Sequence, residues 1–303
     1  MKFKHFAPSA VIVFLIILAS SSHCSGQSDT IYFGLTHHNN IVIKALLNES
    51  DSVYLMFHTA AHSVTLTTDG AEKQQSIIWD SEEDVKSWGG NSKARFSSSN
   101  SLRIGSIVLD SLPIWETINS GPGTDGKIGL DLFYGSAVEM NFTKNILVIH
   151  QATPEIPDGF FKVNLEYQDG MLFIEGTSTI EEESHQNRFL FHTGYGGAIL
   201  FDDDFALETQ IGSKIEITSE QELKDSYGNT LVTKMGNLSK FKIGEETFEN
   251  IPVGFFEGDL GRQKVSVMGG DLLKRFDLII DSKREYVYLK TNLMKGEQYT
   301  VFE

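Results

Sequence analysis

The sequence has 303 residues, of which 25 are basic and 41 are acidic, and its formal net charge is -16. Nucleic acids and anionic membrane surfaces bind basic patches, so this balance argues against both as partners. Cys24 is the only cysteine, which excludes a disulfide within the chain, an iron–sulfur cluster and a zinc site built from thiolates. We expect no cofactor.

The first 26 residues have the pattern of a secretory signal peptide. Lys2 and Lys4 precede an apolar stretch, Ala10–Leu18, which is followed by the small residues Ala19–Ser22. Cleavage after Gly26 would suit the preference for small residues at the processing site. The apolar stretch is shorter than the roughly 20 residues that a membrane-spanning helix needs, and no other stretch is longer, so we expect no transmembrane span.

This pattern predicts export, to the periplasm or out of the cell, and an exported chain without disulfides is typical of bacteria. Cys24 leaves one alternative, which is lipidation and anchoring at that residue, as in bacterial lipoproteins. However, His23 stands where a small residue is expected. In either case we expect a monomer.

The rest of the chain is rich in short apolar or alternating segments. Examples in chain order are SVYLMF, VSVMGG and FDLIIDSKREYVYLK, and Gly, Asn, Asp and Ser separate such segments. Alternation with a period of two and frequent turn residues predict an all-β protein with many hairpins. One helix is predicted over Asp202–Leu207, because its first aspartates can cap free N–H groups and Gly212 can end it.

Three blocks occur twice in the same order. A His-Thr phrase ends an apolar run at His58 and again at His192. Two longer blocks align without gaps: Leu102–Ile114 with Phe241–Val253, and Lys127–Ile149 with Val267–Leu289. The spacing between the copies is nearly constant, which indicates two homologous halves rather than a solenoid of short repeats.

The repeats predict a division of the chain into four parts. These are a signal peptide over residues 1–26, an N-terminal lobe over 27–150, a linker over 151–159 and a C-terminal lobe over 160–303. Pro154, Pro157 and Gly159 make the predicted linker stiff and extended.

The duplicated motifs resemble those of the pepsin/retropepsin-like aspartic protease superfamily over nearly the whole chain, from Thr30 to Asn292. In that family each lobe has Asp-Thr-Gly at the end of a buried strand, and later two apolar residues and a glycine. Here the first phrase is His58-Thr59-Ala60 in one half and His192-Thr193-Gly194 in the other. The second phrase is Lys127-Ile128-Gly129, with a polar first residue, and Val267-Met268-Gly269. The segment GGDLLKRFDLIID is similar to the end of exported bacterial aspartyl proteases.

The resemblance implies an all-β, two-lobed pepsin-like fold, with His58 and His192 at the positions of the two catalytic aspartates. The family's carboxylates share one proton and act as base and acid on a water and the scissile carbonyl. An imidazole is bulkier and, with an ordinary pKa of about 6.5, is largely neutral near pH 7. The double replacement predicts lost proteolysis and a binding or interaction role for the cleft between the lobes, with a peptide or protein as partner.

The residues around the histidines supply candidate binding positions. Thr59 and Thr193 match the family's threonines, which bond across to the other lobe, so the resemblance implies that the scaffold can persist without the chemistry. Gly194 matches the family glycine, whereas Ala60 lacks its backbone freedom. Trp88, followed by two glycines, could tip a flap hairpin over the cleft and contact a peptide, or it could pack as an ordinary aromatic side chain.

Three interpretations of the histidine pair stay open. The rings could form a hydrogen-bonded interface pair, or they could bind a metal ion with His62 as the third imidazole. They could also serve a histidine-based hydrolase, although no G-x-S-x-G motif supplies a nucleophile. The alternative function is therefore an active peptidase or a metal-dependent hydrolase that uses His58 and His192.

Overall fold

The computed structural model describes residues 28–301 except 88–89, 227, 229 and 257–262. The predicted signal peptide, with Cys24, and the candidate binding residue Trp88 lie outside the described residues. Within the described part of the chain, no helix combines the length and the apolar character needed to cross a membrane.

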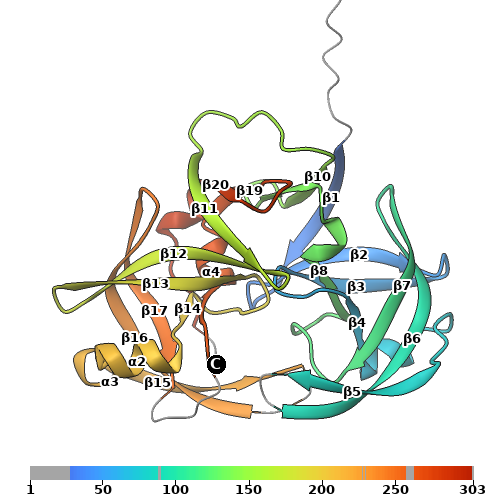
Figure 1. Cartoon of the computed structure of the whole chain (residues 1–303), viewed down its shortest axis with the longest axis horizontal. Helices are drawn as coiled ribbons and strands as arrows, with labels where there is room; N and C mark the ends of the chain where they lie inside the picture. The colour runs from blue at the N-terminus through green and yellow to red at the C-terminus, as the bar shows by residue number, and fades with distance from the viewer. Residues whose placement is uncertain (1–27, 88–89, 227, 229, 257–262, 302–303) are drawn as a thin grey trace, which may run out of the picture.

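The protein is all-β, with two lobes that flank a central sheet (Figure 1). The elements of the N-terminal half are β1 (Ser28–Leu35), β2 (Ile41–Leu47), β3 (Asp51–His58), β4 (Val64–Thr67), α1 (Thr68–Glu72), β5 (Ser81–Ser87), β6 (Gly90–Ile104), β7 (Ile107–Thr117), β8 (Gly126–Gly129), the 3-10 helix η1 (Leu130–Phe133), β9 (Ala137–Asn141) and β10 (Ile146–His150).

The C-terminal half repeats this arrangement after residues 151–160, which form no strand. Its elements are β11 (Phe161–Gln168), β12 (Met171–Ile180), β13 (Glu183–His192), β14 (Ile199–Leu200), α2 (Asp203–Thr209), α3 (Ile211–Lys214), β15 (Ile217–Lys224), β16 (Thr230–Ile243), β17 (Glu246–Phe255), β18 (Ser266–Gly269), α4 (Gly270–Leu273), β19 (Phe276–Ile280), β20 (Tyr286–Thr291) and the 3-10 helix η2 (Leu293–Gly296).

The strand pairings show the duplication directly. In the first lobe β3 pairs in parallel with β8, and β4 pairs antiparallel with β8 and parallel with β7. In the second lobe β13 pairs in parallel with β18, and β14 pairs antiparallel with β18 and parallel with β17. The two halves therefore bring the His-Thr phrases to equivalent strand ends.

A six-stranded antiparallel sheet joins the lobes, in the order β1, β10, β9, β19, β20 and β11. Its centre is the pairing of β9 with β19, one strand from each half, in which Met140 lies opposite Leu278 and Val138 opposite Ile280. All four side chains are fully buried. Burial of apolar surface here fixes the orientation of the two lobes relative to each other.

Alternating sequence explains the individual strands. In β2, Ile41, Ile43, Ala45 and Leu47 are buried while Lys44 between them is exposed, as the period of two requires for a strand with one core face. The apolar faces of both lobes join one large buried cluster that extends from Ile31 to Leu289.

The predicted helix over Asp202–Leu207 corresponds to α2, and its start is confirmed. The Asp202 carboxylate accepts a hydrogen bond from the backbone N–H of Phe205 at 2.7 Å. The predicted end at Gly212 is wrong, because Gln210 adopts a left-handed conformation with φ 55° and ends α2 there. Gly212 lies inside the next short helix, α3.

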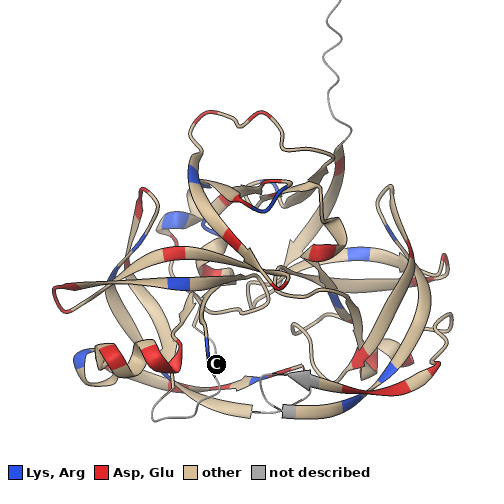
Figure 2. Ribbon diagram, in the orientation of Figure 1, with Lys and Arg blue, Asp and Glu red and all other residues tan. Residues whose placement is uncertain are grey.

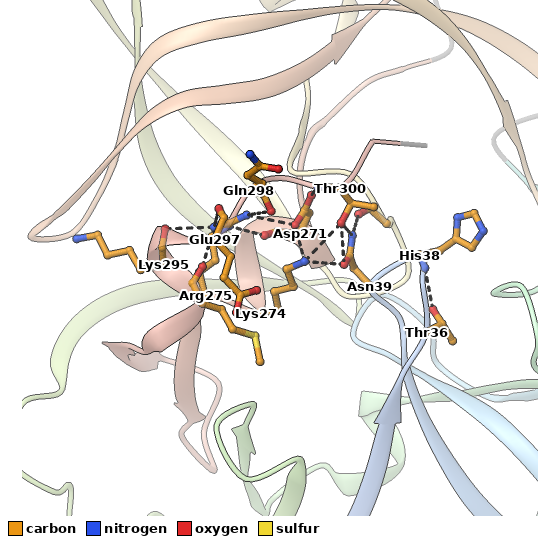
Figure 3. Close-up of polar contacts among 12 residues, drawn as sticks. Thr36, His38, Asn39, Asp271, Lys274, Arg275, Lys295, Glu297, Gln298 and Thr300 are labelled. Atoms are coloured by element: carbon orange, nitrogen blue, oxygen red, sulfur yellow. Dashed lines mark hydrogen bonds and ion pairs between the residues drawn. The ribbon is translucent and has the colours of Figure 1, made fainter. Parts of the chain in front are cut away.

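Charged residues are distributed over both lobes, and acidic residues gather along β5 and in α2 (Figure 2). Lys274, Asp271 and Asn39 belong to a buried polar cluster. Lys274 Nζ lies 2.8 Å from Asp271 Oδ1 and donates to Asn39 Oδ1 at 2.9 Å, and the Thr300 N–H donates to Asp271 Oδ2 at 2.6 Å (Figure 3). This cluster ties the C-terminal segment and α4 to the loop after β1, whose Asn39 also donates to Gly196 O at 2.8 Å.

Candidate functional site

The two histidines face each other where β3 and β13 end. Their ring centroids are 4.5 Å apart, and the ring planes meet at 63°. Each strand end is held against a motif glycine, because His58 lies opposite Gly129 and His192 opposite Gly269 in the parallel pairings. A Cβ atom at Gly129 would lie 2.1 Å from Ala61 O, so only glycine permits this close backbone approach.

Four hydrogen bonds of Thr59 and Thr193 lock the two loops together. The Thr59 hydroxyl donates to Phe191 O at 2.6 Å and the Thr193 hydroxyl donates to Phe57 O at 2.8 Å. Each hydroxyl also accepts the other threonine's backbone N–H at 3.1 Å. Both threonines are buried, at 0% and 1% exposure, so the structure brings these predicted residues together in a cross-lobe clasp.

Backbone amides fix the tautomer of each ring. The Ala60 N–H donates to His58 Nδ1 at 3.1 Å, and the Tyr195 N–H donates to His192 Nδ1 at 2.8 Å. A backbone N–H can only donate, so each Nδ1 must be an unprotonated acceptor, and the proton of each neutral ring is on Nε2. No acceptor among the described residues contacts either Nε2, so both rings keep an unused N–H donor.

The surroundings of the rings disfavour the charged form. Burial, followed by the neighbouring His192 and Lys127, holds the pKa of His58 well below its usual value. Burial also lowers the pKa of His192 to about 4, with a further contribution from Lys127. Both rings are therefore neutral around pH 7, because a buried positive charge loses its hydration.

Gly194 leaves room for the His58 ring. A Cβ atom at position 194 would lie 2.4 Å from His58 Nε2 and 2.3 Å from His58 Cδ2, so even alanine would collide with the imidazole. Ala60 is at the matching position of the first lobe. Its backbone N–H donates to His58, and the residue lines the cavity that both histidines line. The first lobe thus tolerates a side chain at position 60, whereas position 194 of the second lobe must be glycine because the His58 ring lies against it.

The histidines line a cavity of about 810 Å³ between the lobes. Lys127, from β8, lines it as well, and its ammonium group donates to Ser226 Oγ at 2.6 Å. Burial lowers the pKa of Lys127 to about 8, although the nearby Asp225 partly opposes the shift. In the sequence, Lys127 is a polar residue at a motif position that the family fills with an apolar one, and that mismatch was the available signal for a site residue.

A hairpin of the second lobe reaches across this cavity to the first lobe. Residues at the β15–β16 tip bond to the segment after β7: Ser226 O accepts from the backbone N–H groups of Ile118 at 2.8 Å and Asn119 at 2.9 Å. The Asn119 side chain donates to Asp225 O at 3.3 Å. In Figure 1 this hairpin and the β5–β6 hairpin both extend along the edge of the molecule opposite the central sheet.

The third imidazole of the predicted metal site does not join the pair. His62 Nδ1 lies 2.7 Å from Asp131 Oδ2, and the Tyr167 hydroxyl donates to the other oxygen of Asp131 at 3.0 Å. The His62 side chain is 53% exposed. In the described part of the chain, no three His, Cys, Asp or Glu side chains gather in a way that could hold a metal ion. His62 is therefore placed with Asp131 rather than with the histidine pair.

Comparison with known proteins places the fold but not the chemistry. No protein-family model and no curated protein sequence matches the chain. Among solved structures it is similar to an aspartic proteinase from Irpex lacteus, with a TM-score of 0.60 and 14% sequence identity over 89% of this chain and 99% of that one. Together with the strand pairings, this similarity shows that the chain has the all-β, two-lobed fold of the pepsin-like aspartic proteases.

Proposed function

We propose that this protein is an exported homologue of the aspartic proteases that has lost proteolysis and binds a peptide or protein segment in the cavity between its lobes. The observation that carries the proposal is the protonation pattern of His58 and His192. Each ring accepts a backbone N–H at Nδ1 and therefore carries its proton on Nε2. The cavity thus receives two hydrogen-bond donors at the positions where the proteases have carboxylates.

This pattern removes the first step of aspartic protease chemistry. A general base must accept a proton from water, but a ring whose Nδ1 is bonded to the backbone and whose Nε2 is protonated has no free lone pair in the cavity. The low pKa values of both rings make them poor bases as well. Neither histidine can replace the shared-proton carboxylate pair.

Binding does not need that pair. The threonine clasp holds the two loops independently of the histidine side chains. A cavity of about 810 Å³ is within the size range of ordinary ligand sites. Its walls come from both lobes and from a hairpin, and interfaces between domains are a preferred place for ligand sites. The scaffold therefore favours a ligand-binding role.

Two assays test the proposal. Purified protein should not cleave casein between pH 3 and pH 8, with or without zinc, whereas cleavage that His58→Ala abolishes would overturn the loss of proteolysis. For binding, a library of synthetic peptides should yield ligands of the wild-type protein. The variant Ala60→Trp, whose side chain fills the cavity, should no longer bind them. The matched control is Ala152→Trp in the exposed linker, which should bind as the wild type does. Equal binding by both variants would place the ligand elsewhere.

A further inference from the structure

His58 and His192 present N–H donors at one side of the cavity, which we call its floor, whereas a pair of aspartates would present mainly acceptor oxygens. His58 and His192 each turn an Nε2–H group away from the backbone amide that bonds Nδ1. Among the described residues neither N–H has an acceptor, and both side chains line the cavity. Both N–H groups can therefore donate to a ligand in the cavity, and a ligand that supplies acceptor oxygens would gain hydrogen bonds there.

A positive charge lies beside these donors. Lys127 lines the same cavity, and its electrostatic effect reaches both rings. One of its three N–H bonds is used by Ser226 Oγ at 2.6 Å, which leaves further donor capacity. Charge-assisted hydrogen bonds to a carboxylate are roughly twice as strong as those between neutral groups.

The wall of the cavity also carries acidic side chains. Glu220, Glu222 and Asp225 also line the cavity, and all three come from β15 and its tip. Glu220 and Glu222 are exposed, so solvent and salt screen their charges. Asp225 is buried and acts on Lys127. Neither Glu220 nor Glu222 makes a hydrogen bond to the histidine Nε2–H groups in the described part of the chain, so these donors can bond an acceptor of the ligand.

We propose that the cavity floor formed by His58, His192 and Lys127 is a carboxylate-binding site. The two oxygens of one carboxylate would accept the two Nε2–H groups, whose rings are 4.5 Å apart, and the ammonium group of Lys127 would lie beside them. This inference rests on the proposed function, since it assigns the ligand chemistry of the same cavity. A peptide could supply the group from its C-terminus or from an acidic side chain.

The test uses a matched pair of probes, N-acetylphenylalanine and its C-terminal amide, which differ only in the carboxylate. We expect the acid to bind about tenfold more tightly than the amide in calorimetric titrations, as for hydrogen bonds to a charged rather than a neutral group. A peptide that ends in phenylalanine and one with an internal glutamate then separate the two sources. Equal affinities of acid and amide would overturn the carboxylate site but leave peptide binding intact.

Variants and spectroscopy assign the contact. Lys127→Met should reduce acid binding about tenfold and leave amide binding unchanged, whereas Lys44→Met, at an exposed lysine of β2 that does not line the cavity, should change neither. In the wild type, the acid should shift the Nε2 resonances of His58 and His192 in nitrogen-15 spectra. Absence of these shifts at saturating acid would overturn the site even if Lys127→Met fails to fold.

Discussion

The histidine pair should make the folded protein less stable as the pH falls from 8 to 5. The folded-state pKa of His58 lies well below 6.5, and that of His192 is about 4. The unfolded chain, with ordinary histidines, then binds more protons than the folded protein as the pH falls through 6.5. The stability contributed by these depressed pKa values is therefore complete above about pH 6.5 and declines below it.

The magnitude follows from His192 alone. A fall from an ordinary pKa of 6.5 to about 4 corresponds to a loss of about 2 kcal/mol in the free energy of unfolding between pH 8 and pH 5. His58 adds to this loss in the same direction. Carboxylates with lowered pKa values, such as Asp51 and Glu116, contribute mainly below pH 5, because the ordinary carboxyl pKa is about 4.

Denaturant unfolding at pH 8, 6.5 and 5 measures the effect. The wild type should lose about 2 kcal/mol or more over this range, whereas the double variant His58→Gln/His192→Gln should lose much less, because glutamine does not titrate. His37→Gln, at an exposed histidine, is the control and should behave as the wild type. If the double variant loses as much stability as the wild type, the pair is not responsible and the reasoning from its burial is refuted.

Three further changes follow from the same geometry. Gly194→Ala should destabilise the protein by about 1–3 kcal/mol, as overpacking does. Adding His58→Ala should relieve that loss in a double-mutant cycle. Additive effects of the two substitutions would show that the two side chains do not collide. Thr59→Val and Thr193→Val should each lower the free energy of unfolding by about 1–3 kcal/mol in chemical denaturation, because buried N–H and C=O groups lose a partner. A loss below about 0.5 kcal/mol would contradict the role of the clasp. Ser226→Ala removes the acceptor of the Lys127 ammonium group, so limited proteolysis should cut the β15–β16 hairpin sooner than in the wild type. Unchanged cleavage would show that this hydrogen bond does not hold the hairpin in place.

The sequence was sufficient for the fold because the fold is duplicated. Paired blocks of apolar alternation, each with its own glycine, recur in one order, and the strands of both halves follow that order. The proximity of His58 to His192 followed from the same repeat, since equivalent loops of two lobes meet at the pseudo-twofold axis. The strand order and the proximity of the two histidines depend on local sequence and on the internal repeat, and the sequence alone reveals both of these.

Other features of the site depend on contacts between distant segments. The tautomer of each ring is set by a backbone amide two or three residues away, and its direction depends on the loop conformation. Lys127 acquires its role from Ser226, on a hairpin of the other lobe. His62 finds Asp131 as its partner, so spacing along the chain alone could not distinguish a metal ligand from a carboxylate-bonded surface histidine.

Histidine side chains at positions 58 and 192 are compatible with the fold because the threonine clasp and the rings use different atoms. The threonine bonds involve only hydroxyl and backbone groups of the two loops, so the side chains at positions 58 and 192 can change without opening the lobe interface. An imidazole then needs only space and one N–H donor for its Nδ1 atom. Gly194 provides space for His58, and the amides of Ala60 and Tyr195 bond the two Nδ1 atoms. The same two amides could bond a carboxylate oxygen, so the proposed loss of acid–base chemistry would lie in two side chains rather than in the backbone that positions them.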